Sequence, residues 1–150
     1  KLWHILVVPQ VKMYSWKVYG GLKSELSHLD LESKGPLMFK QKASQRRKWG
    51  STNLLTKIND DVNILIHNLK KDNVLEVGRL LTNDLEAEVI RLCPSLNKLQ
   101  ERLKSLNTKG VMVSGSGPCV FGLTETEKEA KFIKSILSKR FSRVFAVNTF

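Results

Sequence analysis

The chain has 150 residues, of which 41% are hydrophobic, and it carries a formal net charge of +11 at pH 7. This length and composition predict one domain with its own core and exclude an intrinsically disordered chain. No apolar run approaches the ~18 residues of a membrane span, and the two cysteines form no metal-binding motif, so we expect two buried thiols in a reducing cytoplasm.

The first third of the chain predicts one strand, one short helix and a long loop. Apolar residues 5–8 form a strand that Pro9 ends. Ser15 can cap a helix over 16–26, although its central glycine pair weakens the helix by roughly 1 kcal/mol per glycine. Residues 27–50 predict a surface loop with a basic run at 40–48, which lacks the aromatic residues typical of single-strand nucleic-acid binding. The apolar positions of the helix are Trp16, Tyr19, Leu22 and Leu26.

The middle of the chain predicts four helices. An apolar stripe runs from Leu54 to Leu69, and a shorter helix follows that Asp72 or Asn73 can cap. A third helix covers 85–92 after Asn83-Asp84, and Pro94 opens a fourth that stops before Gly110. The apolar residues of the fourth helix, Leu96, Leu99, Leu103 and Leu106, predict its buried face.

The last third predicts strands at 111–113, 120–123 and 144–147. Thr124-x-x-Glu127 is a capping-box pattern that opens a helix between the last two strands. The whole order predicts an α+β domain with about four antiparallel strands, helices mainly on one face and a ferredoxin-like arrangement.

The loop at 114–118, Ser-Gly-Ser-Gly-Pro, is the most informative stretch of the chain. Its two glycines permit positive φ angles, and its side chains are small and uncharged. Such a loop either closes a tight hairpin or brings backbone N–H groups close to an anion. The loop residues by themselves leave both interpretations open.

Three motifs in this order resemble the C-terminal domain of the GHMP kinases, named for galactokinase, homoserine, mevalonate and phosphomevalonate kinases. They are Asn83-Asp84-Leu85-Glu86, Pro94-Ser95-Leu96 and the segment 113–123, and Val8-Pro9-x-Val11 with Ser15-x-x-Val18-Tyr19 agrees at the front. The resemblance is strongest over 83–123 and thin over 27–52. It implies that residues 1–150 form the C-terminal domain of a longer enzyme. The N-terminal ATP-binding domain, with its phosphate loop and catalytic acid, has no counterpart in the sequence.

The resemblance also implies an activity and site residues. The full enzyme is expected to use ATP and Mg²⁺, bound mainly by its N-terminal domain, to phosphorylate an alcohol in isoprenoid precursor biosynthesis. Ser114, Gly115, Ser116 and Gly117 would form an active-site loop. Tyr19 would stack on the cytosine of a cytidine-diphosphate substrate, or it packs on the core beside Trp16. No catalytic residue or metal ligand is assigned to this chain, which alone should catalyse nothing measurable.

Two alternatives stay open. A homoserine or mevalonate type of kinase shares the same fold, although Tyr19 and the short chain disfavour it. A non-catalytic basic module that binds RNA or another polyanion agrees with the net charge of +11. No strand carries an aromatic pattern typical of RNA-binding domains, so we do not expect nucleic acid as the partner. The sequence departs from the family pattern at Tyr14 and Trp16, whose bulk bears on the substrate contacts beside Tyr19, and at Cys119, which we expect a strand interior to accommodate.

Overall fold

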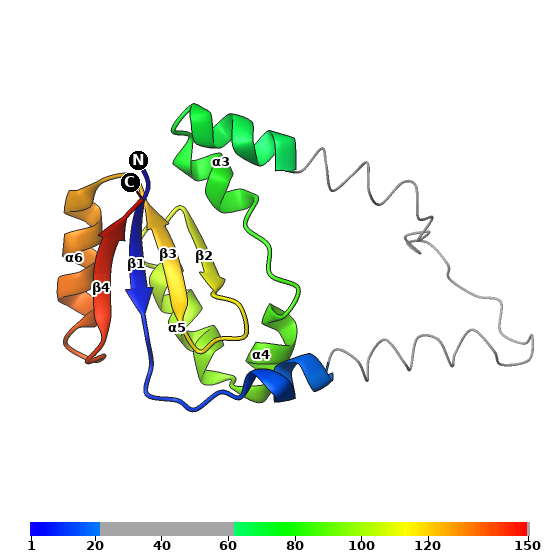
Figure 1. The fold of residues 1–150 in the computed structure, drawn as a ribbon. Coiled ribbons are helices and arrows are strands. Elements are labelled where there is room, and N and C mark those ends of the chain that lie inside the picture. Colours follow the sequence, from blue (N-terminus) through cyan, green and yellow to red (C-terminus); the bar gives the residue numbers. More distant parts are fainter. Residues whose placement is uncertain (22–61, 150) are drawn as a thin grey trace, which may run out of the picture.

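The computed structural model describes residues 1–21 and 62–149 (Figure 1). The predictions for residues 22–26, for the loop 27–50 with its basic run 40–48, and for the helix before residue 62 therefore lie outside the described residues. None of the described helices has the length and apolar character needed to cross a bilayer. Along the chain the elements are β1 Trp3–Val7, helical residues 15–21 and 62–70, α3 Val74–Arg79, α4 Glu86–Leu92, α5 Ser95–Lys104, β2 Gly110–Val113, β3 Val120–Thr124, α6 Glu127–Leu137 and β4 Val144–Asn148.

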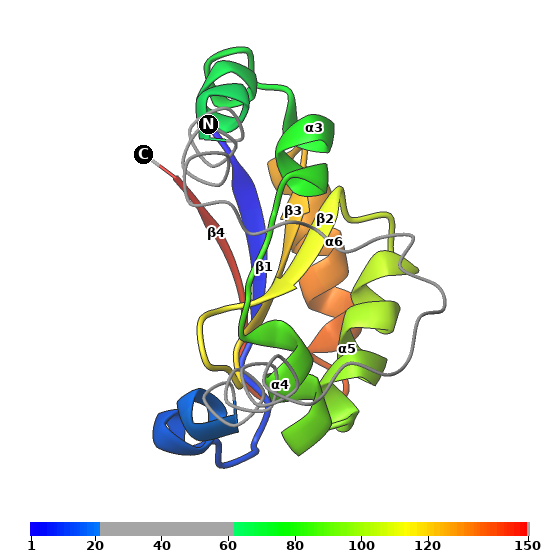
Figure 2. The ribbon, with the colours of Figure 1, turned by 90° about the vertical axis from the view of Figure 1, so that its right-hand side faces the viewer.

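The strands form one antiparallel sheet in the order β2-β3-β1-β4. In the centre of the sheet, Ile5 lies opposite Gly122 on one side and Ala146 on the other. Helices α5 and α6 pack on one face of the sheet (Figure 2). The predicted α+β class and ferredoxin-like arrangement are confirmed.

The main core lies between the sheet and these two helices. Side chains alternate along each strand, so Ile5 and Val7 face the helices while His4 and Leu6 face the other way. In α5 the predicted inward residues Leu96, Leu99 and Leu103 are buried, because their spacing places them on one side of the helix. The fourth, Leu106, lies beyond the end of α5 and is half-buried. Buried core residues include Ile5, Val7, Leu96, Leu103, Val113, Val120, Ile133 and Leu137.

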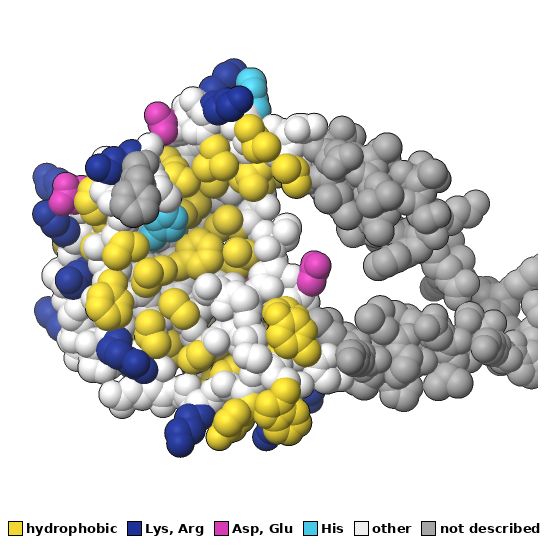
Figure 3. Space-filling view, in the orientation of Figure 1, with side chains coloured by type: hydrophobic (Ala, Val, Ile, Leu, Met, Phe, Trp, Pro, Cys, Tyr) yellow, Lys and Arg dark blue, Asp and Glu magenta, His cyan; other side chains and the backbone are white. Residues whose placement is uncertain are grey.

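The opposite face of the sheet is largely uncovered by the described residues. Phe145 and Val147 of β4 are 45% and 38% exposed there. A second, smaller core at one end of this face joins Leu123 to Val74 and Val77 of α3. Figure 3 shows hydrophobic side chains gathered over this face.

The helix at 62–70 confirms the end of the predicted apolar stripe, but that stripe is not buried by the described residues. Val62, Ile66 and Leu69 are 47%, 43% and 40% exposed. Leu65 is half-buried and packs against the smaller core. Helical spacing therefore predicted the helix correctly, while burial of the stripe depends on what lies against it.

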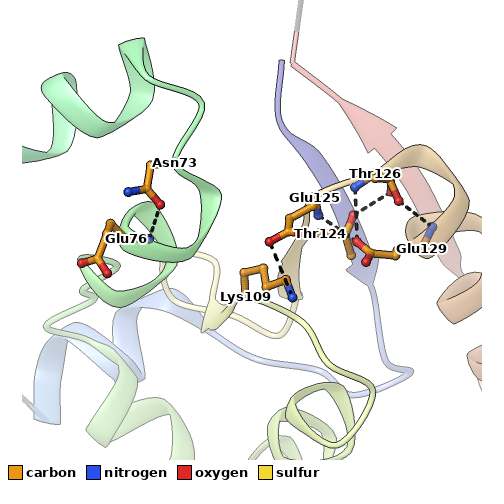
Figure 4. A network of polar contacts seen from close by, with 7 residues as sticks. All are labelled: Asn73, Glu76, Lys109, Thr124, Glu125, Thr126 and Glu129. Carbon is orange, nitrogen blue, oxygen red and sulfur yellow. Dashed lines mark hydrogen bonds and ion pairs between the residues drawn. The ribbon is translucent and has the colours of Figure 1, made fainter.

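The predicted capping box at Thr124 and Glu127 is wrong by two residues. The Oγ1 atom of Thr126 accepts a hydrogen bond from the Glu129 N–H at 3.2 Å, and Glu129 Oε2 accepts one from the Thr126 N–H at 3.2 Å (Figure 4). Thr124 is instead the last residue of β3, opposite Trp3. Two Thr-x-x-Glu patterns overlap in this segment, and strand pairing decides which one opens the helix.

Asn73, rather than Asp72, caps α3. Its side-chain oxygen accepts a hydrogen bond from the Glu76 N–H at 3.3 Å, also drawn in Figure 4. Asp72 has a positive φ of 52° and lies in the turn before the cap.

Candidate active-site loop

The glycine loop closes the hairpin between β2 and β3. The Ser114 N–H donates to the Cys119 carbonyl at 2.8 Å, and the Gly117 N–H donates to the Ser114 carbonyl at 3.0 Å. The Gly117–Pro118 peptide bond is cis. The hairpin interpretation of this sequence is therefore correct, and the remaining question is what the rest of the loop presents.

Both glycines of the loop adopt a positive φ angle, as their presence in the sequence predicted. Gly115 has φ 54° and Gly117 has φ 71°, a region that side chains with a Cβ disfavour. A Cβ at Gly115 would meet no atom within 4 Å, whereas one at Gly117 would lie 3.3 Å from Val89 Cγ1. Gly115 therefore forms the open tip of the loop, and Gly117 packs against α4.

The tip keeps two backbone donors available. Ser114 and Gly117 use their N–H groups inside the loop, but the N–H groups of Gly115 and Ser116 donate to no other described residue. Gly115 is exposed and Ser116 is half-exposed. Consecutive N–H groups in a turn with positive φ are a common anion-binding arrangement. The loop thus closes a hairpin and also offers amides to an anion.

Asn83 attaches the loop to the segment before α4. Its Nδ2 donates to the carbonyls of Val113 at 2.8 Å and Gly115 at 2.9 Å. Its Oδ1 accepts from the Leu85 N–H at 3.1 Å. Sequence reasoning placed Asn83 at a helix start, and the structure shows that it also holds a loop 32 residues away.

Glu86 holds the same strand end through the backbone N–H of Val113. Its Oε1 accepts a hydrogen bond from the Val113 N–H at 2.9 Å and another from the Nε2 of Gln100. Gln100 lies on α5 and is 4% exposed. The motif at 83–86 therefore orients the loop as well as beginning α4, a role that its sequence spacing does not reveal.

Helical residues 15–21 lie at the same end of the sheet as the loop (Figures 1 and 2). The Oγ atoms of Ser15 and Ser116 lie 2.8 Å apart, within hydrogen-bond distance. Val18 is fully buried, while Trp16 and Tyr19 are 70% and 52% exposed. The alternative in which Tyr19 packs on the core beside Trp16 is therefore wrong, because Val18 is the buried residue of this helix.

The helix packs closely on α4 through Gly21. A Cβ at Gly21 would overlap the carboxylate of Glu88, which is 3% exposed. Arg91 donates to both oxygens of Glu88 at 2.6 Å and thereby lowers the pKa of that carboxyl. Gly21 thus permits a close approach between two segments, whereas the sequence indicated only that it weakens the helix.

The described residues around the loop supply binding groups rather than a nucleophile. Burial raises the pKa of the Cys119 thiol, which keeps it protonated and poorly reactive. No group of three or more His, Cys, Asp or Glu residues within 1–21 and 62–149 is placed to hold a metal ion. The arrangement offers two N–H donors, the Ser116 hydroxyl and an exposed Tyr19 at one end of the domain.

Comparisons with known proteins identify the fold. Residues 65–143 match the family model described as GHMP kinases C terminal. The chain is 37% identical over 78 residues to a 4-diphosphocytidyl-2-C-methyl-D-erythritol kinase of Trichodesmium erythraeum, covering 52% of this chain and 25% of the relative. It is 29% identical over 147 residues to a kinase of the same name from Shouchella clausii, covering 97% of this chain and 39% of the relative.

Solved structures show the same fold at lower sequence identity. A 4-(cytidine 5'-diphospho)-2C-methyl-D-erythritol kinase superposes with a TM-score of 0.61 and 21% identity, covering 97% of this chain and 41% of that one. Homoserine kinase from Cytophaga hutchinsonii gives 0.64 and 17%, covering 99% and 42%. Mevalonate kinase of L. major gives 0.63 and 14%, covering 97% and 41%. This chain thus spans less than half the length of each of these relatives.

Proposed function

We propose that this chain, which belongs to the GHMP kinases through their C-terminal domain, is one part of a small-molecule kinase. The full protein would act in the cytoplasm and transfer the γ-phosphate of ATP to the 2-hydroxyl of 4-diphosphocytidyl-2-C-methyl-D-erythritol. That reaction belongs to isoprenoid precursor biosynthesis. The names of the two curated relatives support this substrate.

The observation that carries the proposal is the pair of available N–H groups at Gly115 and Ser116. Phosphoryl transfer places charge on the oxygens of the transferred group, and catalysis depends on donors positioned around that charge. Asn83 and Glu86 restrain the loop before any ligand arrives. Such preorganised donors are what an active-site loop of a kinase requires.

Tyr19 would contact the base of the substrate. Its ring is 52% exposed on the helix that Ser15 joins to the loop. An aromatic ring in such a position can stack on a nucleotide base and contribute about 1–3 kcal/mol. Because the Tyr19 ring does not pack on the core, we propose that its role is recognition of the cytosine.

The partner of this domain would be an N-terminal domain of the same protein. This chain covers only 39% and 41% of two relatives, which are therefore long enough to contain such a domain. ATP would supply the phosphoryl group, and the Gly115 and Ser116 amides suit one of its phosphate oxygens. Among the described residues, no group of three or more His, Cys, Asp or Glu side chains is placed to hold a metal ion. From the resemblance to the family, we propose that the N-terminal domain supplies the catalytic acid and most of the Mg²⁺ ligands.

The test is phosphotransfer by the full protein that contains this chain, with Gly115→Asp as the variant. An aspartate at the tip would repel the phosphate and occupy the space near the amides, so kcat/KM should fall by at least about 100-fold. Asn107→Asp is the matched control, because Asn107 has a φ of 63° and lies in the turn between α5 and β2. Normal turnover by Gly115→Asp would contradict the role of the loop.

The same assay separates the alternatives. Turnover of homoserine or mevalonate, without turnover of the cytidine-diphosphate substrate, would assign the runner-up kinase. The chain of 150 residues assayed alone should show no phosphotransfer. Tight RNA binding by the chain that falls steeply with salt would instead favour the polyanion-binding module. The strands supply no Lys or Arg to the open sheet face, which disfavours that module.

A further inference from the structure

A cavity of about 750 Å³ opens between α5, the end of α6 and residues 8–11. None of the residues that line it belongs to the glycine loop or to helical residues 15–21. Its volume is in the range of about 300–1,000 Å³ that is typical of small-molecule sites. The proposed kinase site does not include this cavity, so the residues that line the cavity are considered separately.

The floor of the cavity is apolar. Leu96, Leu99 and Leu137 line it and are 1%, 4% and 2% exposed, so their positions are fixed by the core. Phe141 lines it as a half-buried aromatic ring. Such a floor favours binding of the apolar part of a ligand, because binding removes that apolar surface from water.

The rim is cationic. Lys98 and Arg102 project from successive turns of α5, and Arg140 follows α6. None of these three side chains forms an ion pair or hydrogen bond with another described residue, and no lining residue is acidic. Three unneutralised positive charges around one cavity favour an anionic group on the ligand.

The walls are tied together across a long sequence separation. Gln10 Nε2 donates to Ser142 Oγ at 3.1 Å, and the Val8 N–H donates to the Arg143 carbonyl at 3.0 Å. These bonds hold residues 8–11 against the segment after α6, so the cavity exists without a ligand. A preformed site spares the ligand the cost of ordering its walls.

We propose that this cavity binds a soluble small molecule that joins an apolar body to a phosphate group. The body would lie on Leu96, Leu99 and Phe141. The phosphate would lie between Arg102 and Arg140, which can donate to it in pairs of hydrogen bonds. Because the lining residues are separate from the glycine loop, this binding does not depend on the proposed kinase activity.

The test is a titration of the full chain with hexyl phosphate, followed by amide chemical shifts in NMR. Saturable shifts should centre on residues 95–99 and 140–142. Inorganic phosphate and hexanol, which each carry half of the ligand chemistry, should bind at least about tenfold more weakly. Equal binding of either half, or shifts spread over the open sheet face, would overturn the proposal.

Variants at the rim keep the test independent of folding. Arg102→Gln and Arg140→Gln remove exposed charges only, and each should weaken hexyl phosphate binding about tenfold, the weight of one charge-assisted hydrogen bond. Lys134→Gln is the control, because Lys134 is an exposed cation of α6 that does not line the cavity. The same affinity in all three variants would overturn the proposal, even if wild-type binding is measurable.

Discussion

The carboxylate of Glu86 accepts a hydrogen bond from the backbone N–H of Val113, 2.9 Å away and 27 residues later in the chain. Asn83 donates to the carbonyl of the same Val113 at 2.8 Å. Two side chains that precede and open α4 therefore fix the strand end from which the glycine loop departs. This relationship links the stability of the domain to the position of its proposed phosphate-binding amides.

Replacing Asn83 by alanine should destabilise the domain. The substitution leaves the Val113 and Gly115 carbonyls without their donor, and the Leu85 N–H without its acceptor, at a cost of about 1–3 kcal/mol. Urea unfolding measures the change. Asn97→Ala is the control, because Asn97 is an exposed residue of α5 and its loss should change stability by less than about 0.5 kcal/mol. Equal effects of the two variants would show that Asn83 does not restrain the loop.

The two loop glycines should respond differently to alanine. Each has a positive φ, which costs alanine about 1–2 kcal/mol. Gly117→Ala should cost more than Gly115→Ala, because only its Cβ comes within 3.3 Å of Val89. Gly20→Ala should instead stabilise the domain by about 0.5–1 kcal/mol, since Gly20 is helical with open space around it. Thermal or urea unfolding of the three variants gives the order, and a larger loss at Gly115 would contradict it.

The capping box at the start of α6 can be tested with two glutamates of the same turn. Glu129→Ala removes the acceptor of the Thr126 and Glu125 N–H groups, whereas Glu127→Ala removes an exposed ion pair with Lys131. Both changes remove one negative charge near the helix N-terminus, so the difference between them isolates the capping box. Glu129→Ala should lose more stability in urea unfolding. A greater loss of stability in Glu127→Ala would instead support the capping box at Thr124 and Glu127 that the sequence predicted.

The stability of the domain should decrease as the pH falls through the titration range of histidine. Burial lowers the pKa of His4, and a hydrogen bond from the His4 ring to the backbone of Leu2 opposes this effect only in part. Because the unfolded chain then binds a proton more readily, His4 contributes stability in full above its unfolded pKa. That contribution is lost as the pH falls toward the folded pKa. Urea midpoints between pH 8 and pH 5 should change less in His4→Gln than in the wild type. An equal change of the midpoint in His4→Gln and in the wild type would contradict the contribution of His4.

Short-range patterns in the sequence predicted most of the elements. The leucine spacing of α5, the β-prone runs and the positive φ of Gly115 and Gly117 depend on residues that are neighbours along the chain. Their physical causes are side-chain periodicity and local backbone sterics, which a sequence displays directly. The α+β class with about four antiparallel strands followed from the same elements, whereas the strand order β2-β3-β1-β4 came from the structure.

The environment of the candidate site depended on contacts between distant segments. The Ser15–Ser116 contact joins residues 101 apart in the chain, and nothing in the local spacing of Tyr19 indicated that Val18 would be buried in its place. The choice between the two Thr-x-x-Glu patterns followed from where β3 stops pairing with β1, at Thr124. The sequence alone thus determined the elements, the glycine loop and the family resemblance. Only the tertiary structure decided which side chains hold the loop and which face solvent, because those contacts form when remote segments pack.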